Sequence, residues 1–385
     1  MSHWRNRPPL ESGACPDSAK TMTATPATEV PGTKRASGRR LRELDSLRGI
    51  AAVCVLLFHL STTANDHYHQ WPIQVPWGHF GVELFFVISG FVILMTLEKS
   101  AGVTEFLISR VTRLYPAYWC AVLLTSALLT AELSPAAPSF SALMADLTML
   151  QSFLRVRSID PSYWTLTAEL IFYVAIVAWY RFRSARLPDI EWYALGWIGA
   201  AAVLRTALLL HHHATLPGPI SMPLLLYYGQ FFIVGICLYR LYCGHNTRVT
   251  LVTLLAACTL SAFGGGPITL YAAPVPYFLL TCGIAAVVFL ATRSRLPLLR
   301  NPVLLFFGDI SYPLYLIHQV IGTELMSMSH EHGWPAWVSL PGILLALVTV
   351  AYLIHVAVEV PARTTLRTRL QKWALLQPRA PSRVM

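Results

Sequence analysis

Residues 44–64 read LDSLRGIAAVCVLLFHLSTTA. This stretch has the length of about 20 mostly apolar residues that a helix needs to cross the hydrocarbon core of a bilayer. Two polar residues inside it, Arg48 and His59, lie eleven positions apart. Eleven residues make about three helical turns, so the sequence predicts one helix that projects both side chains from the same face, about 16 Å apart along its axis.

The composition of the whole chain also favours a membrane protein. Of the 385 residues, 55% are hydrophobic and 12% are charged, about half of the ~25% that soluble domains carry. The formal net charge is +10. In a soluble protein this charge would favour nucleic acid as a partner, whereas in a membrane protein an excess of Lys and Arg marks the cytoplasmic loops. We therefore expect a lipid bilayer as a partner and no nucleic acid.

The apolar stretches predict ten membrane spans. They are residues 44–64, 81–97, 114–132, 163–181, 190–210, 221–240, 250–264, 268–291, 302–327 and 336–357. With the N-terminus inside, only Arg155 and Arg157 of the 29 Lys and Arg residues fall in the predicted outer loops. Because short cytoplasmic loops are enriched in Lys and Arg, this predicts an all-α, polytopic bundle of about ten transmembrane helices, with both termini cytoplasmic, in the plasma membrane.

The two ends of the chain differ from the apolar middle. Residues 1–40 are rich in Pro, Ser, Thr and Ala and contain no apolar run, so we expect a disordered basic cytoplasmic tail rather than a cleaved signal peptide. Residues 41–365 form the predicted membrane domain, and residues 366–385 a short basic cytoplasmic tail. The seven cysteines show no metal-ligand spacing, and most lie in apolar runs.

Several titratable residues fall inside the predicted spans, where a charge is expensive and therefore points to function or to structural pairing. Glu83 enters the second span at a depth similar to that of His59, and we expect this carboxylate to orient the imidazole and raise its basicity. Arg110 and Arg113 are three residues apart, so they are neighbours on one helix face and suited to binding phosphates beside Arg48.

Structural readings of the same residues stay open. The arginines could simply mark the cytoplasmic side, and His59 could be a hydrogen-bonded core histidine. Glu169 and His318, both in the predicted outer half, could form polar contacts between helices. We expect Arg205 to extend its side chain outward to the membrane surface. The run His211-His212-His213 has no evident partner ligands, so we expect no metal.

Six short strings go further than composition. In order they are LDSLRGIAA (44–52) followed by Phe58-His59, GVELFFVISGF (81–91), RVTRLYP (110–116), YWTL (163–166) with Glu169, Phe172 and Tyr173, GDISYPLYLIH (308–318), and EVP (359–361). Together they resemble the motifs of the acyltransferase 3 family of membrane O-acyltransferases. Thr165 departs from the family pattern, which has Ser at this position. The resemblance covers about residues 41–365.

The resemblance implies a ten-helix bundle that transfers a short acyl group, often acetyl, from cytoplasmic acyl-CoA to a hydroxyl. The acceptor would be a glycan or a secreted small molecule such as a macrolide, and the transfer is expected to finish within the bundle. On this basis we expect the following roles: His59 and Glu83 catalytic; Arg48, Arg110 and Arg113 holding acyl-CoA; Trp164, Glu169, Tyr315 and His318 lining the acceptor pocket; and no metal.

Two other function classes fit the polar residues. A proton-coupled transporter or flippase of envelope precursors would use intramembrane His and Glu as a proton relay, although we find no internal repeat of the transporter kind. A non-catalytic scaffold in an envelope assembly is the third reading. For the enzyme, both direct transfer and a covalent acyl intermediate stay open.

Overall fold

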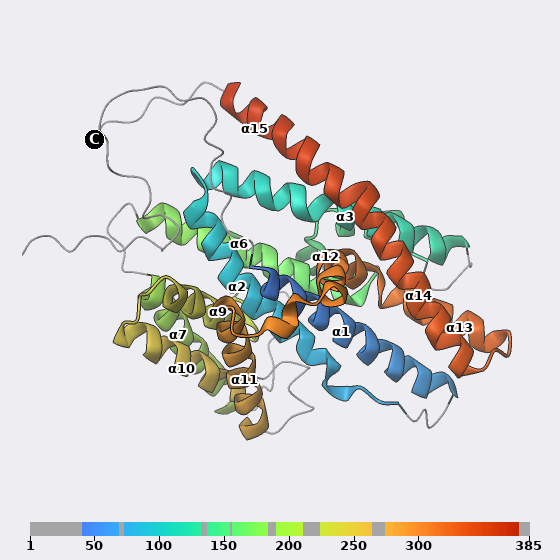
Figure 1. The fold of residues 1–385 in the computed structure, drawn as a ribbon, viewed down its shortest axis with the longest axis horizontal. Coiled ribbons are helices and arrows are strands. Elements are labelled where there is room, and N and C mark those ends of the chain that lie inside the picture. The colour runs from blue at the N-terminus through green and yellow to red at the C-terminus, as the bar shows by residue number, and fades with distance from the viewer. Residues whose placement is uncertain are drawn as a thin grey trace, which may run out of the picture.

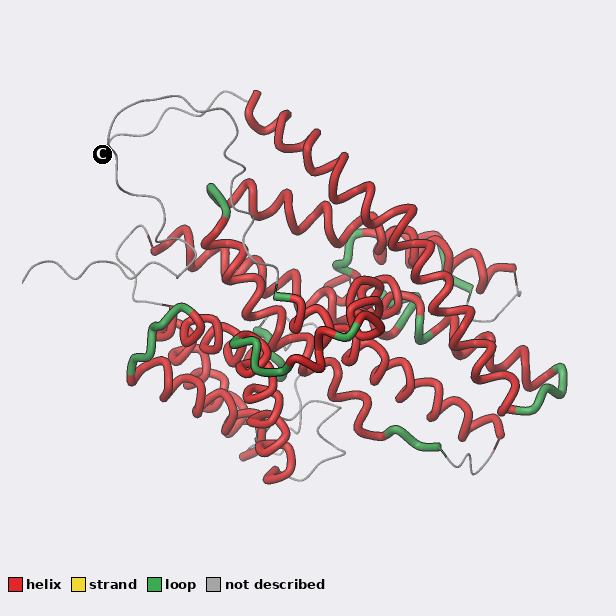
Figure 2. Tube along the Cα trace, in the orientation of Figure 1, coloured by secondary structure: helices red, strands yellow, loops and turns green. Residues whose placement is uncertain are grey.

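The computed structural model describes residues 41–68, 73–131, 137–154, 156–183, 190–210, 224–263 and 274–376. Within these ranges the chain is helical, and turns or short loops without any strand connect the helices (Figure 2). The predicted all-α class is thereby confirmed for the described part of the chain. The predicted tail at residues 1–40 and the His211–His213 run lie outside the described residues.

Helices occupy the apolar stretches found in the sequence. They are α1 (Arg42–Tyr68), α2 (Gly81–Lys99), α3 (Val103–Ala131), α4 (Phe140–Leu147), α5 (Gln151–Leu154), α6 (Trp164–Arg183), α7 (Ile190–Leu210), α9 (Gly229–Tyr242), α10 (Arg248–Ala262), α11 (Pro274–Thr292), α12 (Pro302–Ile317), α13 (Val320–Glu331), α14 (Ala336–Ile354) and α15 (Arg367–Leu376). Short 3₁₀ turns that begin with Pro precede α2, α6 and α12, at Pro76–Phe80, Pro161–Tyr163 and Pro297–Arg300. The fixed φ of Pro suits the first turn of a helix.

The interior of the bundle is built on α1, α2 and α12. Helix α1 packs most extensively against α12, and α2 against α9. Figure 1 shows α7, α9, α10 and α11 gathered on one side of α2, with α3, α14 and α15 on the opposite side. The helices that carry Arg48, His59 and Glu83 are therefore enclosed by others.

Six helical segments are long and apolar enough to cross a membrane, counted over the ranges described above. They are Arg42–Tyr68, Pro76–Lys99, Val103–Ala131, Pro161–Phe182, Pro274–Thr292 and Ala336–Trp373. The bent pair α12 and α13 makes a seventh if it is one broken span. Helices α9 and α10 are apolar, but their 14 and 15 residues fall short of the ~20 that a full crossing needs. The ten-span count and the cytoplasmic termini stay predictions.

The span predicted at 302–327 is broken in the middle. Helix α12 ends at Ile317, α13 begins at Val320, and the two are bent by 70°. The first N–H groups of a helix have no partner within it. At the start of α13, the Val320 N–H donates to Asp160 Oδ2 at 3.1 Å. Irregular backbone at membrane depth is tolerated where it lines a cavity or is buried in protein. His318 lies at this break.

Arg205 does not reach outward as we expected. Its side chain is buried and donates to the carbonyl oxygens of Leu226 and Leu260 and to Gln230 Oε1. Leu260 is in the last turn of α10, where carbonyls lack helical partners. The guanidinium therefore joins α7 to the end of α10 and to the segment before α9, so this intramembrane charge has a structural role.

Helices α2 and α9 approach each other so closely that only glycine fits at the contact. A Cβ atom built on Gly235 would lie 2.7 Å from the backbone nitrogen of Phe91, and one on Gly90 would lie 2.8 Å from the carbonyl carbon of Phe232. Backbone atoms cannot move aside as a flexible side chain can. This glycine pair, on facing helices, sets the distance between them.

We expect Gly235→Ala to lower the free energy of unfolding by about 1–3 kcal/mol, the usual cost of forcing extra volume into a packed interior. Thermal unfolding of the purified protein in detergent measures the effect. Gly283→Ala is the matched control, because a Cβ there has no neighbour within 4 Å. Equal melting temperatures for the two variants would contradict the proposed contact.

Candidate active site

Arg48 and His59 face interior space from α1, as their spacing predicts. Arg48 lines a cavity that also contains Arg113, and His59 lines a second cavity further along the helix. We call the first the arginine chamber and the second the histidine chamber. A single helix thus carries one predicted residue into each space.

The arginine chamber has a volume of about 240 Å³ and is almost entirely polar. It is lined by Asp45, Arg48, Arg113, Gly308, Asp309, Ser311, Tyr312, Glu359 and Arg363. Three arginines and three carboxylates therefore share one space, and they come from α1, α3, α12 and the segment after α14. Arginine presents five N–H donors in a planar fork, the geometry that binds phosphate oxygens in pairs.

The histidine chamber is slightly larger, at about 280 Å³. Its lining is mainly apolar and aromatic with a few polar groups: Val55, Phe58, His59, His79, Val82, Pro161, Ser162, Trp164, Tyr315 and Gln319. Pockets of this character bind small organic ligands, whose orientation is set by the polar groups. Within the described residues, the lining includes no Asp, Glu, Lys or Arg.

A narrow cavity of about 40 Å³ lies between the two chambers, and we call it the neck. It shares Arg48, Ser311 and Tyr312 with the arginine chamber. It shares Val82 and Tyr315 with the histidine chamber. The three spaces therefore follow one another through the bundle, from a polar, arginine-rich end to an aromatic end that contains an imidazole.

A second histidine lies beside His59. The ring centroids of His59 and His318 are 5.2 Å apart. His318 Nδ1 is 2.6 Å from the carbonyl oxygen of Tyr315, and since a carbonyl only accepts, Nδ1 carries the proton and Nε2 has the lone pair. That Nε2 is buried and has no hydrogen-bond partner among the described residues. The break between α12 and α13 thus presents a basic nitrogen in the interior.

Glu83 has a different partner from the one we predicted. Its Oε1 accepts a hydrogen bond of 2.6 Å from the Tyr277 hydroxyl, on α11. In the described part of the chain no hydrogen bond joins His59 to Glu83, and Glu83 does not line the histidine chamber. The expected His–Glu pair is therefore not formed, and the carboxylate is bonded to a tyrosine 194 residues away in the sequence instead.

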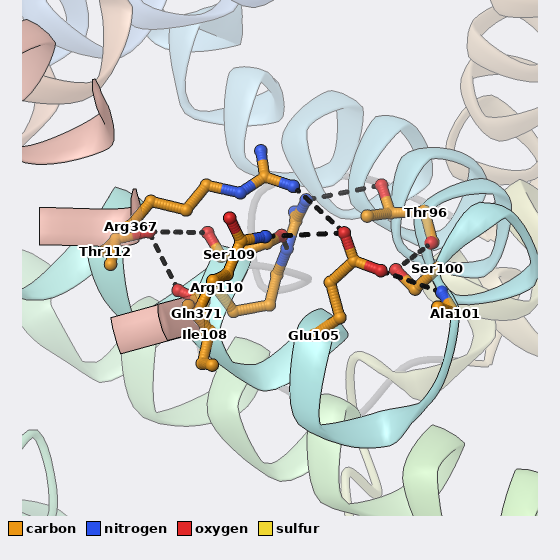
Figure 3. A network of polar contacts seen from close by, with 10 residues as sticks. All are labelled: Thr96, Ser100, Ala101, Glu105, Ile108, Ser109, Arg110, Thr112, Arg367 and Gln371. Carbon is orange, nitrogen blue, oxygen red and sulfur yellow. Dashed lines mark hydrogen bonds and ion pairs between the residues drawn. The ribbon is translucent and has the colours of Figure 1, made fainter. Parts of the chain in front are cut away.

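The structure also separates Arg110 from Arg113. Arg113 lines the arginine chamber, whereas Arg110 is buried between α2 and α3, where it donates to Thr96 Oγ1 at 3.2 Å (Figure 3). The Arg110 guanidinium also lies over the Phe106 ring. Residues three apart on a helix differ by about 60° in direction. That difference sends one guanidinium into the chamber and the other into the helix contact, so Arg110 does not join the chamber.

The remaining predicted site residues line the path. Glu169 lines the neck and accepts from the Tyr173 hydroxyl at 2.7 Å and from Ser89 Oγ at 3.3 Å. Trp164 lines the histidine chamber, and its ring centroid is 4.5 Å from that of Tyr228. Tyr315 lines both spaces, and its hydroxyl is 2.9 Å from Thr165 Oγ1. These contacts fix the side chains in place before any ligand arrives.

Sequence reasoning missed several lining residues. One of them is His79, which lies four residues before Glu83 in the string WGHFGVE. Its place between aromatic residues at the start of the second predicted span could have indicated it. Glu359 lies in the EVP string and Arg363 two residues after it, and no role was predicted for either. No group of three or more His, Cys, Asp or Glu residues able to hold a metal occurs among the described residues.

Two buried carboxyl groups hold the connection between α4 and α6, which leads into the histidine chamber. Asp146 accepts from the Ile159 N–H at 2.7 Å and from Ser158 Oγ at 3.0 Å. Asp160 accepts from the Ser162 N–H at 2.7 Å. Burial raises the pKa of Asp146 to about 6, although both of its hydrogen bonds favour the ionised form.

Comparison with known proteins shows the family of this chain. A family model described as an acyltransferase domain matches residues 41–356. Acyltransferase MdmB of Streptomyces mycarofaciens is 26% identical over 367 residues, 86% of this chain and 93% of that protein. Exopolysaccharide production protein ExoZ of Rhizobium meliloti is 26% identical over 321 residues, 78% of this chain and 91% of that protein. No solved structure matches.

A third relative is nodulation protein 10 of Rhizobium leguminosarum bv. viciae, 26% identical over 384 residues, 88% of this chain and 98% of that protein. Over the described residues the helical fold has six segments long and apolar enough to cross a membrane, and its cavities bring polar residues together inside the bundle. The chain belongs to the acyltransferase 3 family, because the family model covers most of its length. It is therefore an O-acyltransferase.

Asp146 makes the stability of the connection depend on pH. Its folded-state pKa of about 6 lies above the ordinary value of 3.8, so the folded protein binds an extra proton between these values and loses stability as the pH rises from about 4 to about 6. We expect the difference in melting temperature between the wild type and Asp146→Asn to change over this interval and to be constant above pH 7. Asp66→Asn, at an exposed position, is the control. A difference that is the same at pH 4.5 and pH 7.5 would contradict the assignment.

Proposed function

We propose that this O-acyltransferase moves a short acyl group, acetyl in the simplest case, from cytoplasmic acyl-CoA to a hydroxyl of a glycan or of a secreted small molecule such as a macrolide. The observation that supports the proposal most is the succession of arginine chamber, neck and histidine chamber. A phosphate-bearing thioester suits the first chamber, and a hydroxyl-bearing ring suits the last. The two reactants would meet beside an imidazole.

The donor enters at the arginine chamber. Arg48 and Arg113 bind the CoA phosphates there through charge-assisted hydrogen bonds. We place this chamber on the cytoplasmic side of the plasma membrane, because the surplus of Lys and Arg in the predicted loops lies on that side. The pantetheine arm then extends through the neck, which is lined by Phe85 and Tyr315, whose ring centroids are 5.5 Å apart.

His59 acts as the general base in this proposal. It takes the proton from the acceptor hydroxyl as the oxygen attacks the thioester carbonyl carbon, the carbon–sulfur bond breaks, and the protonated His59 then supplies a proton to the departing CoA thiolate. Net proton change is zero. Tyr315 and His318 form the wall beside the reacting groups, and Glu169 lies in the neck. Glu83, held by Tyr277, takes no part in the proton transfer.

The acceptor occupies the histidine chamber. Trp164 offers an aromatic face for an uncharged ring, and the absence of Asp, Glu, Lys and Arg from the described lining fits a neutral acceptor. The names of the relatives include a protein of exopolysaccharide production and a nodulation protein. Both a sugar and a macrolide present several hydroxyls on a ring with apolar faces.

We expect His59→Ala to lower the rate of acyl transfer by about 10²–10⁴, the usual contribution of a positioned general base. The measurement is the release of CoA from labelled acetyl-CoA by purified protein in detergent with acceptor present. An enzyme consumes donor without a gradient, whereas a transporter does not, so the same assay separates these classes. His332→Ala, an exposed histidine after α13, is the control. Unchanged turnover in His59→Ala would remove this residue from the mechanism.

For the donor site, we expect Arg113→Ala to raise the apparent KM for acetyl-CoA by about tenfold, since a hydrogen bond between charged groups contributes about 1.5–3 kcal/mol. Steady-state kinetics with varied donor at saturating acceptor measures this. The KM for acceptor should not change, and it serves as the internal control. An effect confined to the acceptor would show that Arg113 does not bind the donor.

A further inference from the structure

The last helix is much longer than a membrane crossing requires. The helical segment Ala336–Trp373 has 38 residues, which at ~1.5 Å each is about 57 Å, against a hydrocarbon core of ~30 Å. Figure 1 shows α14 and α15 as one rod that extends past the rest of the bundle alongside α3. About half of this rod therefore lies beyond the apolar core.

The part of the rod that follows α14 contributes two residues to the arginine chamber. Two π-helical turns, His355–Glu359 and Ala362–Leu366, interrupt the α-helix there. Such turns are rare and often occur at functional sites, because the wider turn changes which side chains face inward. Here the chamber is lined by Glu359 from the first π turn and Arg363 from the second.

Glu359 holds Arg363 in position. The Glu359 side chain is 1% exposed, and one of its oxygens pairs with the Arg363 guanidinium. The other oxygen lies 2.7 Å from His355 Nδ1. A guanidinium presents five N–H donors in a planar fork and can contact more than one acceptor at once, so the pairing with Glu359 is compatible with binding of an anion in the chamber.

A second contact fixes the rod against α3. Arg367 pairs with Glu105 at 3.6 Å, and Gln371 Nε2 donates to the same carboxylate at 3.4 Å (Figure 3). Glu105 lies near the start of α3, two turns before Arg113. The helix that carries Arg113 and the rod that carries Arg363 are therefore held side by side, and Arg367 itself does not line the chamber.

We propose that Arg363 completes the donor site, so that Arg48, Arg113 and Arg363, from three separate elements, together bind the phosphates of acyl-CoA. This inference rests on the proposed function. It assigns to the cytoplasmic extension of the last helix a substrate-binding role that replaces the one predicted for Arg110. Because Glu359 anchors Arg363 in advance, little side-chain freedom is lost when phosphate binds.

The test compares two arginines one helical turn apart, Arg363→Ala and Arg367→Ala, with two donors. Acetyl-CoA carries the phosphates, and S-acetylpantetheine presents the same thioester without them. We expect the ratio of kcat/KM for acetyl-CoA to that for S-acetylpantetheine to fall about tenfold in Arg363→Ala and to stay at the wild-type value in Arg367→Ala. A merely structural role of Arg363 would impair both donors equally and leave the ratio unchanged.

Arg363→Gln, a similar-sized neutral side chain, provides the measurement if the alanine variant does not accumulate, and the same fall in the ratio is expected. An unchanged ratio in the Arg363 variants, or an equal fall in Arg367→Ala, would overturn the inference while leaving O-acyl transfer from acetyl-CoA intact. Failure of the wild type to use acetyl-CoA with any acceptor would overturn the proposed function as well.

Discussion

The path through this protein depends on the close contact between α1 and α12. A Cβ atom on Gly49 would lie 2.5 Å from the backbone nitrogen of Gly308, and one on Gly308 would lie 2.7 Å from the carbonyl carbon of Asp45. With the two backbones this close, one helix pair lines the cavities from end to end. Arg48 and His59 come from α1, and Tyr312 and Tyr315 come from α12.

Polar groups in the membrane interior fall into two sets with different surroundings. One set is joined by contacts between helices: Glu83 with Tyr277, Arg205 with helix-end carbonyls, and Arg240 with Glu191 at 2.6 Å. The other set lines open space, as do His59 and Arg113. The cost of burying these polar groups is offset in two ways. In the first set, hydrogen bonds and ion pairs within the protein offset it; in the second, access to solvent or substrate does. The cavities therefore separate structural residues from those suited to chemistry.

The two chambers differ in character in a way that matches two unlike reactants. The arginine chamber contains three guanidinium and three carboxylate groups. The histidine chamber is lined mainly by apolar and aromatic side chains, and its described lining contains no Asp, Glu, Lys or Arg. At the 70° break between α12 and α13, His318 lies beside His59, and two π-helical turns carry Glu359 and Arg363, which line the first chamber. Irregular helix geometry thus occurs where the path needs side chains that a straight helix would direct elsewhere.

The sequence alone determined the helical membrane class, the positions of the apolar helices and the shared face of Arg48 and His59, because these follow from length, composition and the regular rise and turn of one helix. It could not determine the partner of Glu83, the divergence of Arg110 from Arg113, the burial of Arg205 or the arrival of Arg363 beside Arg48. Each of these depends on the rotation and approach of separate helices. Contacts between helices are set by packing over the whole bundle, and only the tertiary structure decides them.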